Sequence, residues 1–350
     1  MFNQHYVDPN DPLEKRIIDK INIRWTQFMM ECHNIVPRTQ SGKLMVGPKK
    51  QQEIERAVAF HLGELKRGFD SEELSDNLMV NFDETHFIIN SDNGKTLGFV
   101  GDDKVRYSDV VSGGEGMTMV VRIVGGLRGK VHIPFMIFKN PRSSYPINTL
   151  DDNVRGVAYR SSPKGFMNGY IFNEYFKEKR IWKRNRSDQK LVVYCDNVPC
   201  HSLNSEIGVK VSATVEKLGA ELRFLPANST HLSQPCDSFV IQKIKEIWTG
   251  LWEKKKLELV NSETFTESGK LPNPGKRYFL ELAAEAVRRV NLLKDRNGLS
   301  YARKAMIRCG MGLDNTGIWN EGQLNVDLQE VVRKHRSYFE GNESSTSDDE

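Results

Sequence analysis

Three aspartates, each in a distinctive local sequence, constrain what this chain of 350 residues can fold into. They are Asp83 in NFDETHF (81–87), Asp196 in VVYCDNVPCH (192–201) and Asp237 at the end of LPANSTHLSQPCD (225–237). The first two lie in or just after apolar, strand-like runs, and the third opens an amphipathic helix. Carboxylates placed in this way can converge on one spot and hold two Mg²⁺ ions, which favours a metal-dependent enzyme.

The order of the elements around these aspartates predicts the fold class. The periodicity gives strands around Asp83, at 117–124 and 131–138, a helix at 166–180, a strand at 191–195, a helix at 203–218, a strand at 221–225 and a helix at 238–256. This is the order of a ribonuclease H-like α/β fold, a mixed five-stranded sheet flanked by helices. In that fold Asp83 lies mid-strand beside the end of a parallel neighbour. Asp83 and Asp196 can then bridge one metal.

Helical periodicity also precedes and follows this α/β segment. Apolar residues recur at helical spacing over 10–37, 49–68, 276–295 and 300–309. We therefore expect a helical segment at 1–75, a catalytic domain at 76–256, a helical C-terminal extension at 257–340 and an acidic disordered tail at 341–350.

Composition excludes several other classes of protein. No apolar run approaches the roughly 20 residues of a membrane span, and the first residues lack a signal-peptide pattern. The five cysteines are an odd number without a Cys-x-x-Cys pair, which argues against a disulfide framework and favours a reducing compartment.

The net charge of +4 hides local basic clusters. Residues 177–190 hold seven basic and two acidic side chains, including Lys183, Arg184 and Arg186. Such clusters fit a polyanionic partner, although a solvated helix face is the more common explanation of any single cluster. We take these three residues and Lys243, on the solvent side of the 238–256 helix, as candidate DNA contacts.

The three aspartate segments, in this order, resemble the signatures of DDE-superfamily transposases and endonucleases of the pogo and mariner type. The resemblance covers about residues 79–252. It implies that Asp83 and Asp196 share one metal, that Asp237 helps to hold a second, and that the ions are Mg²⁺, with Mn²⁺ as a substitute. It also implies DNA with transposon terminal inverted repeats as the partner, a homodimer and a nuclear location. The 41-residue interval from Asp196 to Asp237 is longer than is usual in the family.

Three residues beside the aspartates, Glu84, Asn197 and His201, can have a structural or a functional role. Glu84 alternates with Asp83 along the strand, so we expect it on the opposite face as a surface or structural group. Asn197 can hydrogen-bond a phosphate or a metal-bound water, or it can simply shape the turn. His201 can contact DNA or hold the Asp196 loop in place.

The segment from Trp25 to Arg38 resembles the closing part of the centromere-protein-B-type helix-turn-helix, whose opening helices would precede residue 1. The alternative is a helical pair that packs on the core.

Three functions remain open on these grounds. The first is a transposase-like endonuclease that cuts and joins DNA strands. The second is a domesticated, transposase-derived DNA-binding protein without catalytic activity. The third is a nuclease for RNA or hybrids, which the Gln-Pro-x-Asp sequence before Asp237 argues against.

Overall fold

The computed structural model describes residues 24, 25, 28, 32, 46–90, 111–113, 116–197, 205–263 and 265–342. It divides the chain into two units, Met1–Gly47 and Pro48–Glu350, and the second unit contains all the features discussed below. Most of the helix expected at 10–37, His201 and all but the first two residues of the acidic tail lie outside the described residues.

A mixed sheet forms the centre of the second unit. Its strands are β1 (Met79–Ile88), β2 (Gly116–Val124), β3 (Lys130–Val131), β4 (Phe135–Lys139), β5 (Ala158–Ser162), β6 (Leu191–Cys195) and β7 (Ala220–Phe224). The strand order is β5-β4-β2-β1-β6-β7, with β3 paired to β2. β1, β2 and β4 are antiparallel, whereas β6 and β7 join β1 in parallel. This topology confirms the ribonuclease H-like fold predicted from the sequence.

The sheet has seven strands, two more than the sequence predicts. The strand expected at 131–138 is divided into β3 and β4 by Pro134, which has no N–H to donate to a neighbouring strand. β5 extends the sheet in parallel beside β4. Its sequence, AYRSS, does not predict a strand, because Arg160 interrupts the apolar pattern. The Arg160 charge is balanced inside the protein by Glu178, with 3.0 Å between Nη1 and Oε2.

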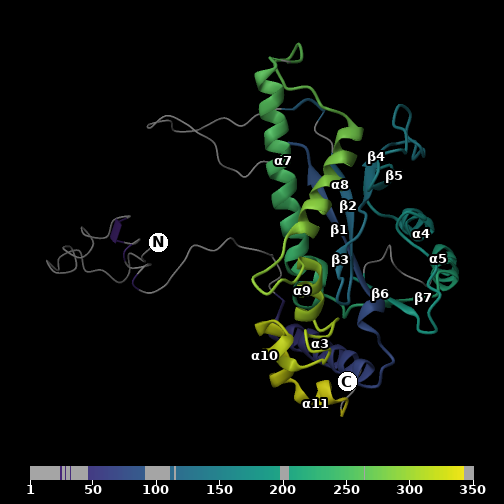
Figure 1. Cartoon of the computed structure of the whole chain (residues 1–350), viewed down its shortest axis with the longest axis vertical. Helices are drawn as coiled ribbons and strands as arrows, with labels where there is room; N and C mark the ends of the chain where they lie inside the picture. The colour runs from purple at the N-terminus through teal and green to yellow at the C-terminus, as the bar shows by residue number, and fades with distance from the viewer. Residues whose placement is uncertain are drawn as a thin grey trace. The chain divides into compact units, whose positions relative to one another are not determined.

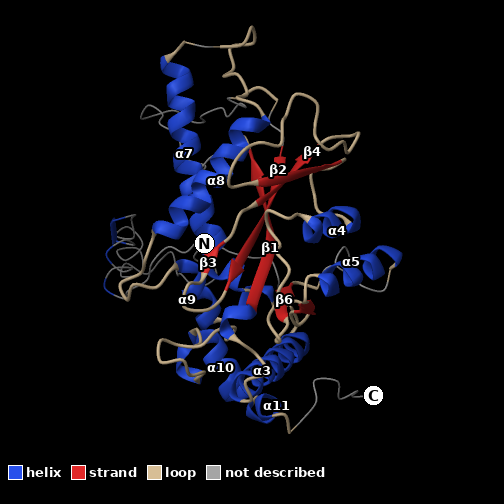
Figure 2. Cartoon of the chain, turned by 45° about the vertical axis from the view of Figure 1, so that its right-hand side comes forward, coloured by secondary structure: helices blue, strands red, loops and turns tan. Residues whose placement is uncertain are grey.

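Helices cover both faces of the sheet (Figure 1; Figure 2). α4 (Gly169–Lys177) and α5 (Glu206–Lys217) lie on one face, and α7 (Ile241–Asn261) and α8 (Lys276–Leu292) lie on the other. The remaining helical elements are α3 (Pro48–Asp70), η2 (Asp76–Leu78), α6 (Thr230–Ser233), η4 (Cys236–Val240), α9 (Tyr301–Arg308), η5 (Glu321–Gln323), α10 (Val326–Lys334) and α11 (Arg336–Glu340). None of the described helices is both long and apolar enough to cross a membrane.

The closing helix buries the stripe that its sequence predicts. Ile241, Ile244, Trp248 and Trp252 are buried, whereas Leu251 is half-buried. The Trp248 ring lies 4.3 Å from the ring of Phe87 in β1, measured between centroids. These contacts fix the rotation of α7 about its axis. They therefore also fix the direction of the side chains in η4, which leads directly into α7.

α3 packs against the last helices of the chain. Lys334 and His335 both contact Glu55, with Lys334 Nζ at 2.6 Å and His335 Nε2 at 3.0 Å from Oε2. Gly63 lies so close to the backbone of Phe339 that a Cβ atom would fall 1.9 Å from the carbonyl oxygen. The helix expected at 49–68 is thus confirmed and belongs to the same unit as the sheet. The domain boundaries at 75 and 256 stay a prediction.

Candidate functional site

The site begins where β6 ends and β1 continues. β1 pairs with β6 only from Met79 to Asn81, opposite Val192 to Tyr194. Past this point the edge of β1 has no β6 neighbour, and Asp83 lies two residues further along the strand. Asp196 directly follows the last residue of β6, so the short parallel strand delivers its carboxylate to the open edge.

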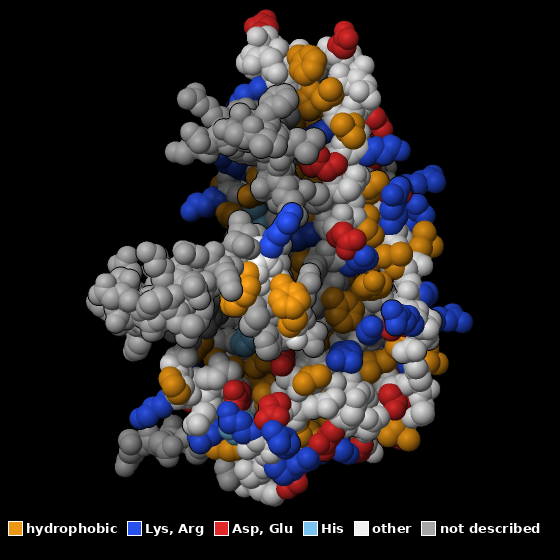
Figure 3. All heavy atoms as spheres, turned by 90° about the vertical axis from the view of Figure 1, so that its left-hand side faces the viewer, with side chains coloured by type: hydrophobic (Ala, Val, Ile, Leu, Met, Phe, Trp, Pro, Cys, Tyr) orange, Lys and Arg blue, Asp and Glu red, His pale blue; other side chains and the backbone are white. Residues whose placement is uncertain are grey.

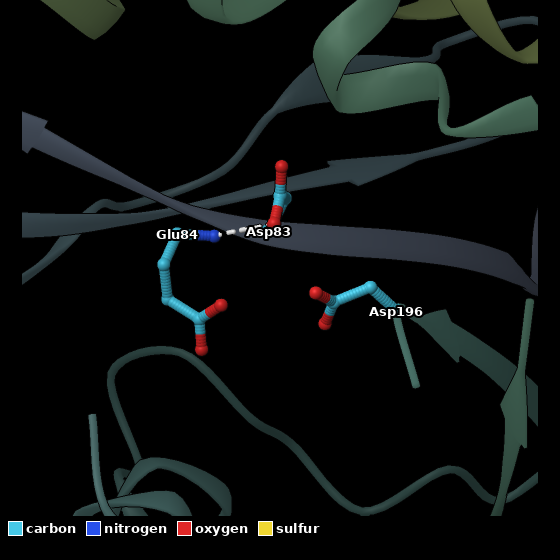
Figure 4. A group of neighbouring side chains, drawn as sticks. All are labelled: Asp83, Glu84 and Asp196. Atoms are coloured by element: carbon cyan, nitrogen blue, oxygen red, sulfur yellow. Dashed lines mark hydrogen bonds between the residues drawn. The ribbon is translucent and has the colours of Figure 1, made fainter. Parts of the chain in front are cut away.

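Three carboxylates meet at this edge. Oxygen atoms of Asp83, Glu84 and Asp196 all lie within 4.8 Å of one another. Figure 4 shows Asp83 and Glu84 leaving β1 on opposite sides, with the Asp196 carboxylate directed toward them. The proximity of Asp83 and Asp196 is the one expected from the sequence. Glu84 leaves the strand on the side opposite to Asp83, as expected, but its carboxylate still lies within 4.8 Å of the other two, which the sequence did not predict.

Asp237 joins the cluster from the other direction. It is the second residue of η4, and its side chain is hydrogen-bonded to Asp83. Burial raises the pKa of Asp83 well above its usual range, and the three neighbouring carboxylates raise it further. Burial likewise raises the pKa of Asp237. Burial and the mutual repulsion of these carboxylates therefore favour a proton shared between Asp83 and Asp237 when no cation is bound.

Asn81 ties together the three elements that carry the aspartates. Its Nδ2 donates to the backbone oxygen of Tyr194 at 3.1 Å, and its Oδ1 accepts from the backbone N–H of Cys236 at 2.9 Å. Asn81 itself is fully buried in β1. One side chain thus connects β1, the end of β6 and the start of η4. Sequence reasoning missed this residue, although its place two residues before Asp83 was the available signal.

The cluster is suited to a hard cation. Its ligand atoms are carboxylate oxygens, which Mg²⁺ and Mn²⁺ prefer over sulfur. The cysteines beside the aspartates do not contribute, because Cys195 and Cys236 are buried and burial raises the pKa of the Cys236 thiol. Among the described residues, the group with metal-binding spacing contains only Asp83, Glu84 and Asp196. The residues present therefore fit divalent cations.

Three of the candidate DNA contacts lie away from the acids. Lys183, Arg184 and Arg186 are exposed in the segment before Leu191, at the end of β6 opposite to Asp196. A five-residue strand spans about 16 Å, so these cations flank the site at a distance.

The remaining candidates lie nearer to the acids or are already paired. Asn197 is exposed directly after Asp196. Lys243 is paired with Glu246, with 2.8 Å between Nζ and Oε2. The neighbouring Lys245 is exposed, and its charge partly offsets the raised pKa of Asp237. Lys245 was expected to face solvent or DNA, and it is a second cation of this helix near the site.

The chain matches a known family over part of its length. Residues 129–292 match the family described as DDE superfamily endonuclease. The match runs from just before β3 to the end of α8, includes Asp196 and Asp237, and begins after Asp83. No curated protein matches the chain.

Several solved structures resemble the fold weakly. The Mos1 mariner paired end complex with Mn has 11% identity and a TM-score of 0.42 over 80% of this chain and 70% of that chain. The Mos1 strand transfer complex has 11% identity and a TM-score of 0.39 over 78% and 68%. The catalytic domain of Mos1 mariner transposase has 12% identity and a TM-score of 0.32 over 73% and 92%. The strand order β5-β4-β2-β1-β6-β7 identifies the fold independently of these similarities.

Proposed function

We propose that the chain is a transposase-like endonuclease that cleaves and joins DNA strands with divalent metal ions. The observation that carries this proposal is that Asp83 and Asp196 meet at one strand edge while Asp237, from a third element, is hydrogen-bonded to Asp83. The match of residues 129–292 to the DDE superfamily endonuclease family supports the same reaction class.

Asp83, Asp196 and Asp237 would hold the metal ions, with Mg²⁺ as the expected cofactor and Mn²⁺ as a substitute. A pair of such ions supplies activation of the attacking oxygen and stabilisation of the leaving oxygen in phosphodiester chemistry. Asp83 must first give up the proton that it shares with Asp237, so ligand binding by this carboxyl is coupled to proton release. Glu84 adds a fourth negative charge close enough to contribute a ligand or orient a water.

The proposed substrate is DNA bearing transposon terminal inverted repeats, bound by a homodimer in the nucleus. Lys245, whose charge acts on Asp237, and Asn197, which follows Asp196, would contact the phosphates nearest the acids. Figure 3 shows several Lys and Arg side chains along the right-hand margin of one face, which suits a polyanionic partner.

The test is strand nicking and transfer on duplex DNA bearing terminal inverted repeats. Asp196→Asn removes one ligand charge with little change in size, so it should abolish cleavage in Mg²⁺ while leaving DNA binding equal or slightly tighter. Asp188→Asn removes the same charge from an exposed position before β6 and should cleave like the parent. Cleavage by Asp196→Asn at the parental rate would refute the assignment.

Binding assays on the same proteins distinguish the alternative function. If the parent binds DNA but does not cleave it with Mg²⁺ or Mn²⁺, the chain is a domesticated DNA-binding protein. Neutralising Lys183, Arg184 and Arg186 together tests whether this basic segment contacts phosphate. Each lost phosphate contact should make the slope of log K against log salt concentration less negative by about 0.9. An unchanged slope would remove these residues from the DNA interface.

A further inference from the structure

A second site is suggested by a cavity of about 1130 Å³ that none of the clustered carboxylates lines. Its walls come from the start of β1, from β2 and β3, from the segments 153–156 and 180–183, and from one side of α8. Arg122 of β2 forms part of the wall and is paired in register with Phe82 of β1. Successive side chains of a strand alternate between faces, so Arg122 and Asp83 project to opposite faces of the sheet.

Arg122 is a buried cation without a compensating anion. Only 5% of its surface is exposed, and it forms no ion pair among the described residues. Its Nη2 donates to Nδ1 of His132 at 2.7 Å, and its guanidinium lies 4.4 Å from the centre of the Trp182 ring. Burial and the nearby cations lower the pKa of His132 to about 3, so this histidine is a neutral acceptor.

Two buried N–H donors in this wall lack a hydrogen-bond partner. They are Nε of Arg122 and Nε1 of Trp182, and both side chains line the cavity. Buried polar groups and buried charges are normally paired, because leaving them unpaired costs free energy. Two unpaired N–H donors beside a large cavity indicate that their hydrogen-bond partner is a ligand.

The rim of the cavity carries further uncompensated cations. Lys130, Arg155 and Lys183 are exposed, and none forms an ion pair within the part of the chain that the structure describes. The other cations of the wall are different, since Arg288 is paired with Glu285, for example, at 2.6 Å. Excess positive charge is therefore confined to Arg122 and these three rim residues.

We propose that this cavity binds a phosphate-bearing anion through Arg122, with Lys130, Arg155 and Lys183 at the rim. A guanidinium matches the geometry of phosphate oxygens. Because it is more weakly hydrated than a lysine ammonium, a buried arginine binds phosphate more readily than a buried lysine would. Four unpaired cations suit a multiply charged phosphate better than a single carboxylate. The phosphate can belong to a DNA backbone or to a small free anion. The proposal does not depend on metal binding by the aspartates.

Thermal unfolding of the whole protein with inorganic pyrophosphate tests the site. Chloride at equal ionic strength corrects for general screening. A ligand that binds only the folded state raises the midpoint of unfolding, so the parent should show a saturable rise. Arg122→Met should lose this rise, and Lys183→Ala should reduce it. Lys217→Ala removes an exposed lysine of α5 outside the cavity and should keep the parental response.

DNA binding by the same variants distinguishes the two sources of phosphate. If the occupant is the DNA backbone, pyrophosphate competes with duplex DNA and Arg122→Met weakens DNA binding. If it is a small anion, Arg122→Met loses the pyrophosphate response and binds DNA like the parent.

If Arg122→Met does not fold, the double variant Arg155→Ala with Lys183→Ala carries the test, because both residues are exposed. A full parental response to pyrophosphate and to DNA in that double variant would overturn the proposal. So would an absence of any response in the parent.

Discussion

Replacing Asn81 should separate the three aspartate-bearing elements without touching any of the carboxylates. Asn81→Leu keeps nearly the same volume but removes both the amide donor and the amide acceptor. The carbonyl of Tyr194 and the N–H of Cys236 then lose their partner inside the protein, at 3.1 Å and 2.9 Å from the present amide. The residue is fully buried, so water cannot readily replace it.

The size of the effect follows from these two contacts. A buried group left without its hydrogen bond costs about 1–3 kcal/mol, so the free energy of unfolding should fall by about 2–6 kcal/mol. The start of η4 and the end of β6 also lose their common anchor. Loss of a residue that orients metal ligands typically weakens metal affinity by about 10–100-fold. We therefore expect both lower stability and weaker Mn²⁺ binding.

Urea unfolding and Mn²⁺ titration by calorimetry measure the two effects. Leu62→Ala is the matched control, because Leu62 is fully buried in α3 and its truncation costs about 2–5 kcal/mol without contacting the acids. The control should lose stability and keep its Mn²⁺ affinity. Parental Mn²⁺ affinity in Asn81→Leu would refute the positioning role. Equal loss in both variants would show that metal affinity merely follows global stability.

Three further changes test the site and its support. Glu84→Gln should weaken Mn²⁺ binding in calorimetry, since its carboxylate lies within 4.8 Å of two others; parental affinity would make it a bystander. Burial raises the pKa of Asp83, so the folded state favours the protonated carboxyl. With a chelator present to remove metal ions, the protein should therefore lose stability as the pH rises through that pKa. Asp83→Asn should flatten this dependence in urea unfolding, and an unchanged profile would contradict the assignment. Trp252→Phe removes the 2.8 Å hydrogen bond to the oxygen of Ile89, so the free energy of unfolding should fall by about 1–3 kcal/mol; no fall in urea would contradict this.

Much of the fold could be predicted because its determinants are local. The apolar stripe of α7, the buried run of β6 and the turn signals between strands are each visible within a short window. The order of these elements then leaves few topologies, since parallel neighbours need helical crossovers. β5 was not predicted because the charge of Arg160 is balanced by Glu178, a residue outside the strand itself.

The sequence alone determined which carboxylates are available and that Asp83 and Asp196 would meet at a strand end. Only the tertiary structure decided that Glu84 lies within reach of them, because this depends on how far β6 extends along β1. The connection from Asn81 to Cys236 spans 155 residues, and that from Arg122 to Trp182 joins a strand to a loop. Local periodicity records which side of an element is buried. It carries no information about the partner that this side meets, which depends on how distant elements pack together.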